Sequence, residues 1–171
     1  MFAPCLAEVL RHEGGYSDNP KDPGGATNLG VTLGTWQDWT GKPATKADIK
    51  ALTLAKVTPL YKARYWDAVK GDDLPPALAL CVFDFAVNGG PERAARYLQR
   101  MVGAAQDGKI GRQTLLAVQQ YVTAHTLALA VRDYQQERRG YYRKLETFPT
   151  FGRGWLRRVD EVETAALRML K

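Results

Sequence analysis

The feature that most restricts the fold is an apolar segment near the middle of the chain. Residues 77–87 follow Pro75-Pro76, end at Asn88-Gly89-Gly90 and carry no continuous polar stripe. A helix that is apolar on all sides has to be covered by the rest of the protein. The sequence therefore predicts a central buried helix, with the other elements packed around it.

Breaking signals divide the remaining chain into segments in which apolar residues recur at helical spacing. We expect helices over residues 2–13, from Thr45, over 53–69, 77–87, from Pro91, over 112–122 and 125–146, and after residue 152. Thr45 and Asp48 approximate a capping box, and Pro59 should kink its helix or mark the true start. Residues 16–35, rich in Gly, Pro, Asn, Asp and Thr, predict a long loop with at most a small β-hairpin around residues 29–33. The predicted class is mainly α.

Domain organisation follows from length and from one break. A chain of 171 residues can bury one core, or form two small lobes that share one. No change in composition marks a linker, but Gly89-Gly90-Pro91 divides the chain near its middle. We expect a single compact unit of two lobes, residues 1–90 and residues 91–171.

Charge restricts the class of partner. The net charge is +6, most of it in residues 132–171, which favours polyanionic partners such as nucleic acid, anionic lipid or a bacterial envelope. No helix-turn-helix, zinc-finger or aromatic-basic RNA motif accompanies the charge. We therefore expect no nucleic-acid partner and retain an anionic envelope surface as a candidate.

The cysteines, histidines and apolar runs of the chain argue against a disulfide framework, a metal site and a membrane span. Cys5 and Cys81 lie among apolar residues and favour free thiols over a bridge. His12 and His125 have no Cys or acid at metal-ligand spacing, so we expect no metal. No run approaches the roughly 18 apolar residues of a membrane span, and residues 1–6 lack the features of a secretory signal.

One carboxylate stands out at the end of the first predicted helix. Glu13 lies four and seven residues after Val9 and Leu6, on the face that the apolar residues commit to the core. Burial and the negative end of the helix dipole both disfavour a charged carboxyl there and predict a raised pKa. A general acid needs a raised pKa to carry a proton at neutral pH.

Spacing alone leaves other roles open for Glu13. The side chain can turn outward at the helix end, or pair with Arg11 or with an arginine of the last helix. Hydrolysis of a glycosidic bond usually needs a second polar group, and Asp18 and Asp22 are candidates within one loop.

Motifs along nearly the whole chain carry a family resemblance. His12-Glu13-Gly14-Gly15-Tyr16, followed by residues 22–32 (Asp-Pro-Gly-Gly-Ala-Thr-Asn-Leu-Gly-Val-Thr), resembles the opening signature of the glycoside hydrolase family 108 muramidases. The Glu-Gly-Gly-Tyr element is that family's catalytic motif. The resemblance continues through residues 65–66, 73–75, 83–90 and 151–159. It implies a lysozyme-like helical fold.

The resemblance also implies catalytic roles. The interval from Glu13 to Asp22 is similar to that of the T-even phage lysozymes, whereas the interval from Asp22 to Thr27 is one residue shorter. By this analogy Glu13 protonates the glycosidic oxygen, while Asp22 and Thr27 position or activate water. The reaction would then invert the anomeric centre, with the carboxyls about 6.5–9.5 Å apart; a nucleophilic Asp22 at about 5–5.5 Å is the alternative.

Further residues are candidates for binding substrate. Tyr16 and Tyr65 offer flat faces and polar edges to sugar rings, and Thr32 ends the opening signature. Asp84 and Asn88 lie one helical turn apart on the apolar helix and need polar partners. They either bracket the floor of a cleft or have a structural role, such as holding the Gly-rich loop.

The second half carries a weaker resemblance. It is similar to small helical peptidoglycan-binding modules, through Leu98-Gln99, Asp107-Gly108, Ile110-Gly111, Thr114 and residues 117–119. The alternative is that these helices simply complete the core of the first lobe, and both readings can hold together.

These resemblances imply an endolysin-type N-acetylmuramidase that lyses bacterial cell walls. It would be a monomer without cofactors, made in a bacterial cytoplasm without a signal peptide and acting on peptidoglycan in the periplasm. The main alternative is a non-catalytic wall-binding or secretion-assisting protein of the same fold. Chitinases, chitosanases and lytic transglycosylases are alternatives among enzymes.

Overall fold

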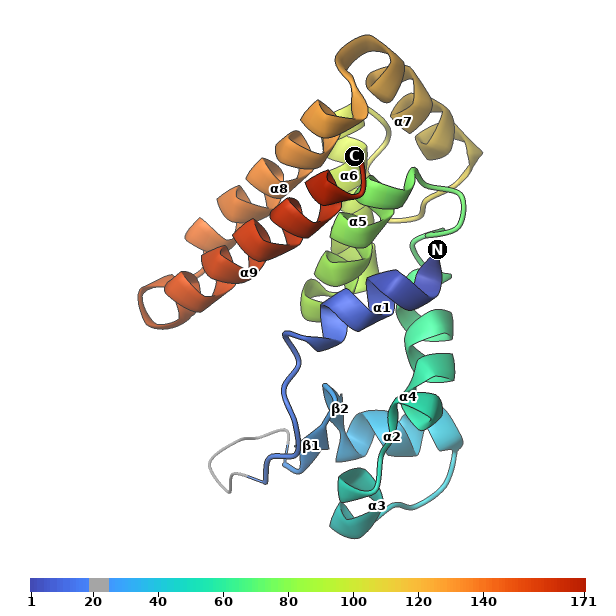
Figure 1. The fold of residues 1–171 in the computed structure, drawn as a ribbon, viewed down its shortest axis with the longest axis vertical. Helices are drawn as coiled ribbons and strands as arrows, with labels where there is room; N and C mark the ends of the chain where they lie inside the picture. Colours follow the sequence, from blue (N-terminus) through green and yellow to red (C-terminus); the bar gives the residue numbers. More distant parts are fainter. Residues whose placement is uncertain (19–24) are drawn as a thin grey trace.

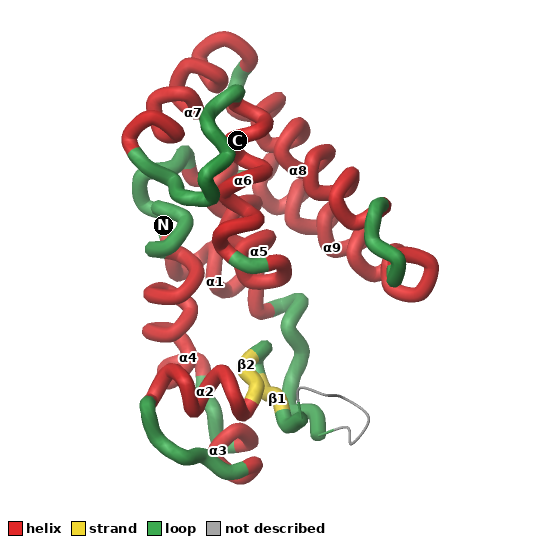
Figure 2. The backbone as a smooth tube through the Cα atoms, turned by 180° about the vertical axis from the view of Figure 1, so that it is seen from behind, coloured by secondary structure: helices red, strands yellow, loops and turns green. Residues whose placement is uncertain are grey.

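The computed structural model describes residues 1–18 and 25–171, and this part of the chain is mainly α-helical (Figures 1 and 2). The α-helices are α1 (Phe2–Leu10), α2 (Leu33–Thr40), α3 (Lys46–Lys50), α4 (Leu54–Tyr61), α5 (Pro76–Gly89), α6 (Pro91–Val102), α7 (Arg112–His125), α8 (Leu127–Arg143) and α9 (Phe148–Arg168). A π-helix, η1 (Lys62–Trp66), follows α4, and strands β1 (Thr27–Asn28) and β2 (Val31–Thr32) form a hairpin.

Helix α5 is the centre of the fold, as its apolar sequence predicts. Every side chain from Ala77 to Ala86 is buried, and the helix contacts α1, η1, α6, α8 and α9 (Figure 1). An aromatic cluster packs η1 and α1 against it: Phe83 packs edge-on against Trp66 with ring centroids 5.4 Å apart, and both contact Phe2. Phe85 packs against Tyr97 and Tyr134, so the core continues into the second half of the chain.

The small predicted β-hairpin is present and is tied to the helices beside it. Thr27 pairs with Thr32 in an antiparallel register, and the turn residues Leu29 and Gly30 have φ values of 50° and 72°. Two positive φ values suit the right-handed twist of a tight hairpin. The buried side-chain amide of Asn28 donates hydrogen bonds to the carbonyls of Ile49 and its neighbours, so the hairpin is held against α3.

Two features of the first lobe differ from the sequence prediction. Helix α2 begins inside the predicted loop, because the Thr32 side chain accepts a hydrogen bond from Thr35 N–H and caps it. Pro59 does not mark the start of its helix, since α4 begins at Leu54 after the Thr53 cap. The predicted capping box at Thr45 is confirmed.

Residues 91–171 end in a long antiparallel pair, α8 and α9, which extends away from the central helix (Figures 1 and 2). The predicted break over residues 148–152 is wrong, because α9 begins at Phe148. Pro149 lies in the first turn, where its missing N–H costs no helical hydrogen bond. Gly152 packs directly on the Phe148 ring.

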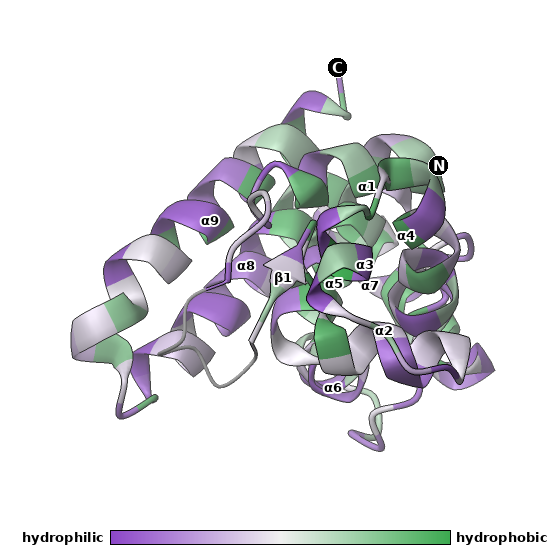
Figure 3. Ribbon diagram, turned by 90° about the horizontal axis from the view of Figure 1, so that it is seen from below, coloured by the Kyte–Doolittle hydropathy of each residue, from purple (hydrophilic) through white to green (hydrophobic). Residues whose placement is uncertain are grey.

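Ten consecutive residues of α5 are buried, whereas hydrophilic residues recur along α8 and α9 (Figure 3). Within residues 1–18 and 25–171, no helix combines the length and apolar character needed to cross a bilayer. Cys5 and Cys81 are free and buried, and burial raises the pKa of the Cys5 thiol to about 11.

Candidate functional site

The site is built around Glu13, which follows the last turn of α1. Backbone hydrogen bonds from His12 N to Val9 O (3.0 Å) and from Glu13 N to Leu10 O (3.3 Å) continue the turn beyond the helix. Gly14, with φ of 71°, then reverses the chain. The Glu13 side chain is 17% exposed, so it is mostly buried while part of it still reaches solvent.

An arginine from the last helix binds this carboxylate. Arg158 Nη2 on α9 donates to Glu13 Oε1 over 2.6 Å, and the Arg158 side chain is 12% exposed. Pairing with a base of the last helix was one of the roles that spacing left open for Glu13. The ion pair fixes one carboxylate oxygen and brings the two ends of the chain together.

Arg158 is itself held by a buried carboxylate. Asp84 on α5 accepts hydrogen bonds from Nε and Nη2 of Arg158 at 3.0 and 2.7 Å, and from Nη1 of Arg138 at 2.6 Å. The side chains of Asp84 and Arg138 are fully buried. Burial raises the pKa of Asp84, but the two guanidinium groups outweigh it and hold this pKa below its usual value. The ionised cluster joins α5, α8 and α9.

The second oxygen of Glu13 faces the hairpin turn. A methyl group on Gly30 would lie 2.7 Å from Glu13 Oε2 and would overlap the hydroxyl of Tyr61. That hydroxyl donates a hydrogen bond to Leu29 O over 2.8 Å, which holds the turn in place. Glycine at position 30 therefore allows the backbone to approach the carboxylate.

Two tyrosines complete this side of the site. The rings of Tyr61 and Tyr65 lie 5.6 Å apart, on α4 and η1. Burial, followed by the negative charge of Glu13, raises the pKa of Tyr61 well above its usual value. Burial also raises the pKa of Tyr65, with Glu13 contributing and Arg64 opposing. Both hydroxyls remain protonated at neutral pH and can serve as hydrogen-bond donors.

A cavity of about 440 Å³ lies beside the ion pair, with Arg158 in its wall. It is lined by Arg11, His12, Asn88, Gly154, Trp155, Arg157, Arg158 and Glu161. Its wall is polar and carries both signs of charge, with His12 Nδ1 3.5 Å from Glu161 Oε2. Such a wall suits a ligand rich in hydroxyl and amide groups.

The predicted catalytic partners of Glu13 occupy the segment after it. Asp22 lies outside the described residues. Thr27 lies in β1 and is partly buried, in the hairpin whose turn contacts Glu13. The Thr32 side chain caps α2 and exchanges hydrogen bonds with Thr35. Tyr16 is exposed, with Lys50 Nζ 5.8 Å from its ring centroid.

The remaining predicted residues lie around Arg158. Tyr65 is partly buried near Glu13. Asn88 is exposed, lines the 440 Å³ cavity and accepts a hydrogen bond from the Tyr142 hydroxyl. Asp84 has no exposed surface, so its role as a direct substrate contact is corrected: its side chain positions Arg158. The alternative, a structural role for Asp84, fits the structure better. Its side chain holds two arginines, however, and not the Gly-rich loop.

Sequence reasoning gave no role to Arg158, Tyr61 or Gly30. The sequence does point to a partner of the Arg158 kind, because an Asp on an apolar helix requires a cationic or hydrogen-bond-donor partner. Nothing in the spacing distinguishes Arg158 from the other arginines of the last helix. Within residues 1–18 and 25–171, no group of three or more His, Cys, Asp or Glu side chains could hold a metal ion.

A mainly helical fold, with a mostly buried carboxylate at the end of its first helix facing a small hairpin, defines a lysozyme-like protein. Residues 6–90 match the family model described as glycosyl hydrolase 108, and residues 93–160 match a model described as a predicted peptidoglycan domain. The chain belongs to the glycosyl hydrolase 108 family. It is therefore a lysozyme-like protein that acts on peptidoglycan, in a family of glycoside hydrolases.

A solved structure supports the same assignment. The structure of Brucella abortus SagA is 44% identical to this chain, covers 98% of this chain and 94% of its own, and superimposes with a TM-score of 0.86. No curated protein matches the sequence. Arg158 lies in the segment matched as a peptidoglycan domain, whereas Glu13 lies in the glycosyl hydrolase segment. Both matched segments thus contribute to the site.

Proposed function

We propose that this protein is an N-acetylmuramidase, which hydrolyses the β-1,4 bond between N-acetylmuramic acid and N-acetylglucosamine with Glu13 as the general acid. One observation carries the proposal: the carboxylate is mostly buried and fixed through Oε1 by Arg158, while Oε2 faces the hairpin turn. A proton donor has to be held within hydrogen-bond reach of the leaving oxygen. A carboxylate with one oxygen anchored and the other directed to one side meets that requirement.

The water that completes hydrolysis is proposed to be positioned by Asp22 and Thr27. Thr27 supports this role through its place in the hairpin next to the Gly30 turn. If these residues act on water, the product forms with inverted configuration. Proton NMR of the first product anomer tests this step: an α anomer is expected, and a β anomer would instead assign Asp22 as a nucleophile.

Mass spectrometry of digested peptidoglycan tests the activity itself. A muramidase leaves muropeptides that end in a reducing N-acetylmuramic acid. Products with an anhydro end would show a lytic transglycosylase, and a reducing N-acetylglucosamine end would show cleavage of the other glycosidic bond. An unchanged sacculus bound by the protein would indicate the non-catalytic alternative. Each of these three results contradicts the proposed activity.

We also propose an endolysin-like role, in which the protein is made in a bacterial cytoplasm and acts as a monomer on the wall in the periplasm. The net charge of +6 supports attraction to an anionic envelope. Purified protein added to cells with a permeabilised outer membrane should clear the suspension. Intact turbidity despite active digestion of isolated sacculi would contradict the lytic role.

A further inference from the structure

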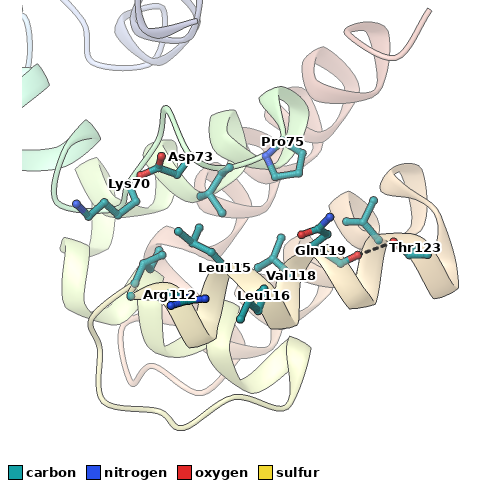
Figure 4. Close-up of a pocket in the computed structure, with 13 residues that line it drawn as sticks. Lys70, Asp73, Pro75, Arg112, Leu115, Leu116, Val118, Gln119 and Thr123 are labelled. Atoms are coloured by element: carbon teal, nitrogen blue, oxygen red, sulfur yellow. Dashed lines mark hydrogen bonds between the residues drawn. The ribbon is translucent and has the colours of Figure 1, made fainter.

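A second cavity, of about 740 Å³, lies between α7 and the segment that leads into α5 (Figure 4). One wall comes from residues 70–75 and the other from residues 110–123. None of the lining residues is aromatic. The cavity is an open groove, which we call the α7 groove.

The middle of the α7 groove is aliphatic. Leu115, Leu116 and Val118 lie together along its floor (Figure 4), and the Leu116 side chain is 48% exposed. Sugar rings usually bind against aromatic faces with several polar groups around them. An aliphatic floor without an aromatic ring is better suited to small alkyl side chains than to a pyranose.

One end of the groove carries charges of both signs. Lys70, Asp73 and Arg112 are gathered there, away from Gln119 and Thr123 at the other end (Figure 4). Lys70 adopts a φ of 54°, which is uncommon for a residue with a side chain. Its carbonyl accepts a hydrogen bond from Asp73 N over 2.9 Å, which holds the tight turn and both charged residues beside the groove.

The groove lies apart from Glu13. Its first wall follows η1, where Gly71 packs on Trp66, and Trp66 contacts Phe2 at the start of α1. Glu13 follows the opposite end of that helix, and Figure 1 shows α7 beyond the N-terminus. Most of the lining residues fall in the segment matched as a predicted peptidoglycan domain.

We propose that the α7 groove binds the stem peptide of peptidoglycan; this inference rests on the proposed function. A stem peptide combines alanine methyl groups with free carboxylates and, in many walls, with the ammonium group of a diamino acid. The aliphatic floor complements the methyl groups. Arg112 and Lys70 complement the carboxylates, and Asp73 complements the ammonium group.

A groove that binds the peptide gives the protein a second binding site for the same substrate. A glycan strand that carries peptides would be retained by both sites, whereas a strand without peptides would be retained only near Glu13. The enzyme should therefore prefer peptide-bearing glycan to strands stripped by an amidase, and the difference should appear in KM more than in kcat.

Calorimetric titration of the full chain with a synthetic stem tetrapeptide tests the proposal. Arg112→Ala and Lys70→Gly should each weaken binding about tenfold or more, because a charge-assisted hydrogen bond is lost. Glycine at position 70 suits the positive φ, so folding is kept. Arg132→Ala, which removes an equal charge from an exposed position on α8, is the matched control and should bind normally.

The outcomes separate this inference from the proposed function. Glu13→Gln should bind the tetrapeptide like the wild type, whereas both groove variants should still cleave peptide-free strands. Absence of saturable binding, an equal loss in Arg132→Ala, or tighter binding of peptide-free glycan at the groove would each overturn the proposal. Self-association that Arg112→Ala abolishes would overturn it in favour of a second copy of the chain.

Discussion

At the scale of single residues, the two oxygens of one carboxylate have different surroundings. Glu13 Oε1 is bound by Arg158, and Oε2 lies against the hairpin turn at Gly30. The sequence makes Glu13 a candidate acid through its place on the apolar helix face and the Glu-Gly-Gly-Tyr motif that it begins. It could not identify Arg158, which lies 145 positions away along the chain, because local spacing holds no information about that contact.

The closeness of Gly30 to Glu13 leads to a prediction at this scale. Gly30→Ala should abolish most activity, because the new methyl group would displace the carboxylate or the Tyr61 hydroxyl. Gly41→Ala is the matched control: Gly41 has a similar φ of 66°, but a methyl group there meets nothing within 4 Å. Gly41→Ala should lose about 1–2 kcal/mol of stability, the usual cost of a side chain in a left-handed conformation. Gly30→Ala should lose more, because its methyl group also overlaps Tyr61 and Glu13.

Thermal unfolding and rates of peptidoglycan digestion distinguish the two effects. We expect Gly41→Ala to keep its activity, and Gly30→Ala to lose most of its activity at temperatures where it is still folded. If both variants digested peptidoglycan at the same rate, Gly30 would have no special relation to the catalytic carboxylate.

At the scale of secondary-structure elements, Asp84 connects three helices. It lies on α5 and binds Arg138 of α8 and Arg158 of α9, and thereby places Arg158 against Glu13. Removal of one partner from a buried ion pair leaves the other charge uncompensated. The carboxylate of Glu13, the proposed acid, is therefore positioned from the core of the protein.

Asp84→Asn should destabilise the fold by about 3–5 kcal/mol at neutral pH, because Arg138 stays buried without its counter-charge. Asp160→Asn is the control: Asp160 pairs with Arg139, but its side chain is 63% exposed, so the loss should stay below about 1 kcal/mol. Urea unfolding of both variants measures the difference, and similar losses would contradict the account.

The same cluster predicts a dependence on pH. The pKa of Asp84 is lowered in the folded protein, so its contribution to stability is complete above the unfolded value of 3.8 and is lost as the pH falls through the folded value. The stability gap between the wild type and Asp84→Asn should therefore narrow below about pH 4. If the stability difference between the two proteins increased on acidification, folding would have to raise the pKa of Asp84, not lower it.

Elements with strong local signals could be predicted, and those defined by tertiary contacts could not. The apolar run of α5, the capping box of α3 and the Leu29-Gly30 hairpin all have clear sequence signals. Helix α2 was missed because its first residues, Leu33, Gly34 and Thr35, continue a Gly- and Thr-rich segment. The π-helical geometry of η1 gives no periodicity that differs visibly from that of an α-helix.

At the scale of the whole molecule, the positive charge should govern attachment to the wall. With a net charge of +6, adsorption to intact sacculi should weaken steadily between about 50 mM and 500 mM salt, as screening shortens the reach of the charges. Cleavage of an uncharged soluble glycan should change far less over that range. Sedimentation of protein with sacculi measures adsorption, and salt-independent adsorption would contradict the electrostatic role.

The proposed function depends above all on Glu13 as the general acid. Glu8→Gln is a matched control for Glu13→Gln, because Glu8 lies on α1, is 18% exposed and pairs with Arg11, while Glu13 is 17% exposed and pairs with Arg158. The decisive measurement is the release of reducing sugar from purified peptidoglycan by these two variants. We predict that Glu13→Gln loses at least about 100-fold in rate while Glu8→Gln keeps wild-type activity. Comparable activity in both variants would contradict the assignment of Glu13 as the catalytic acid.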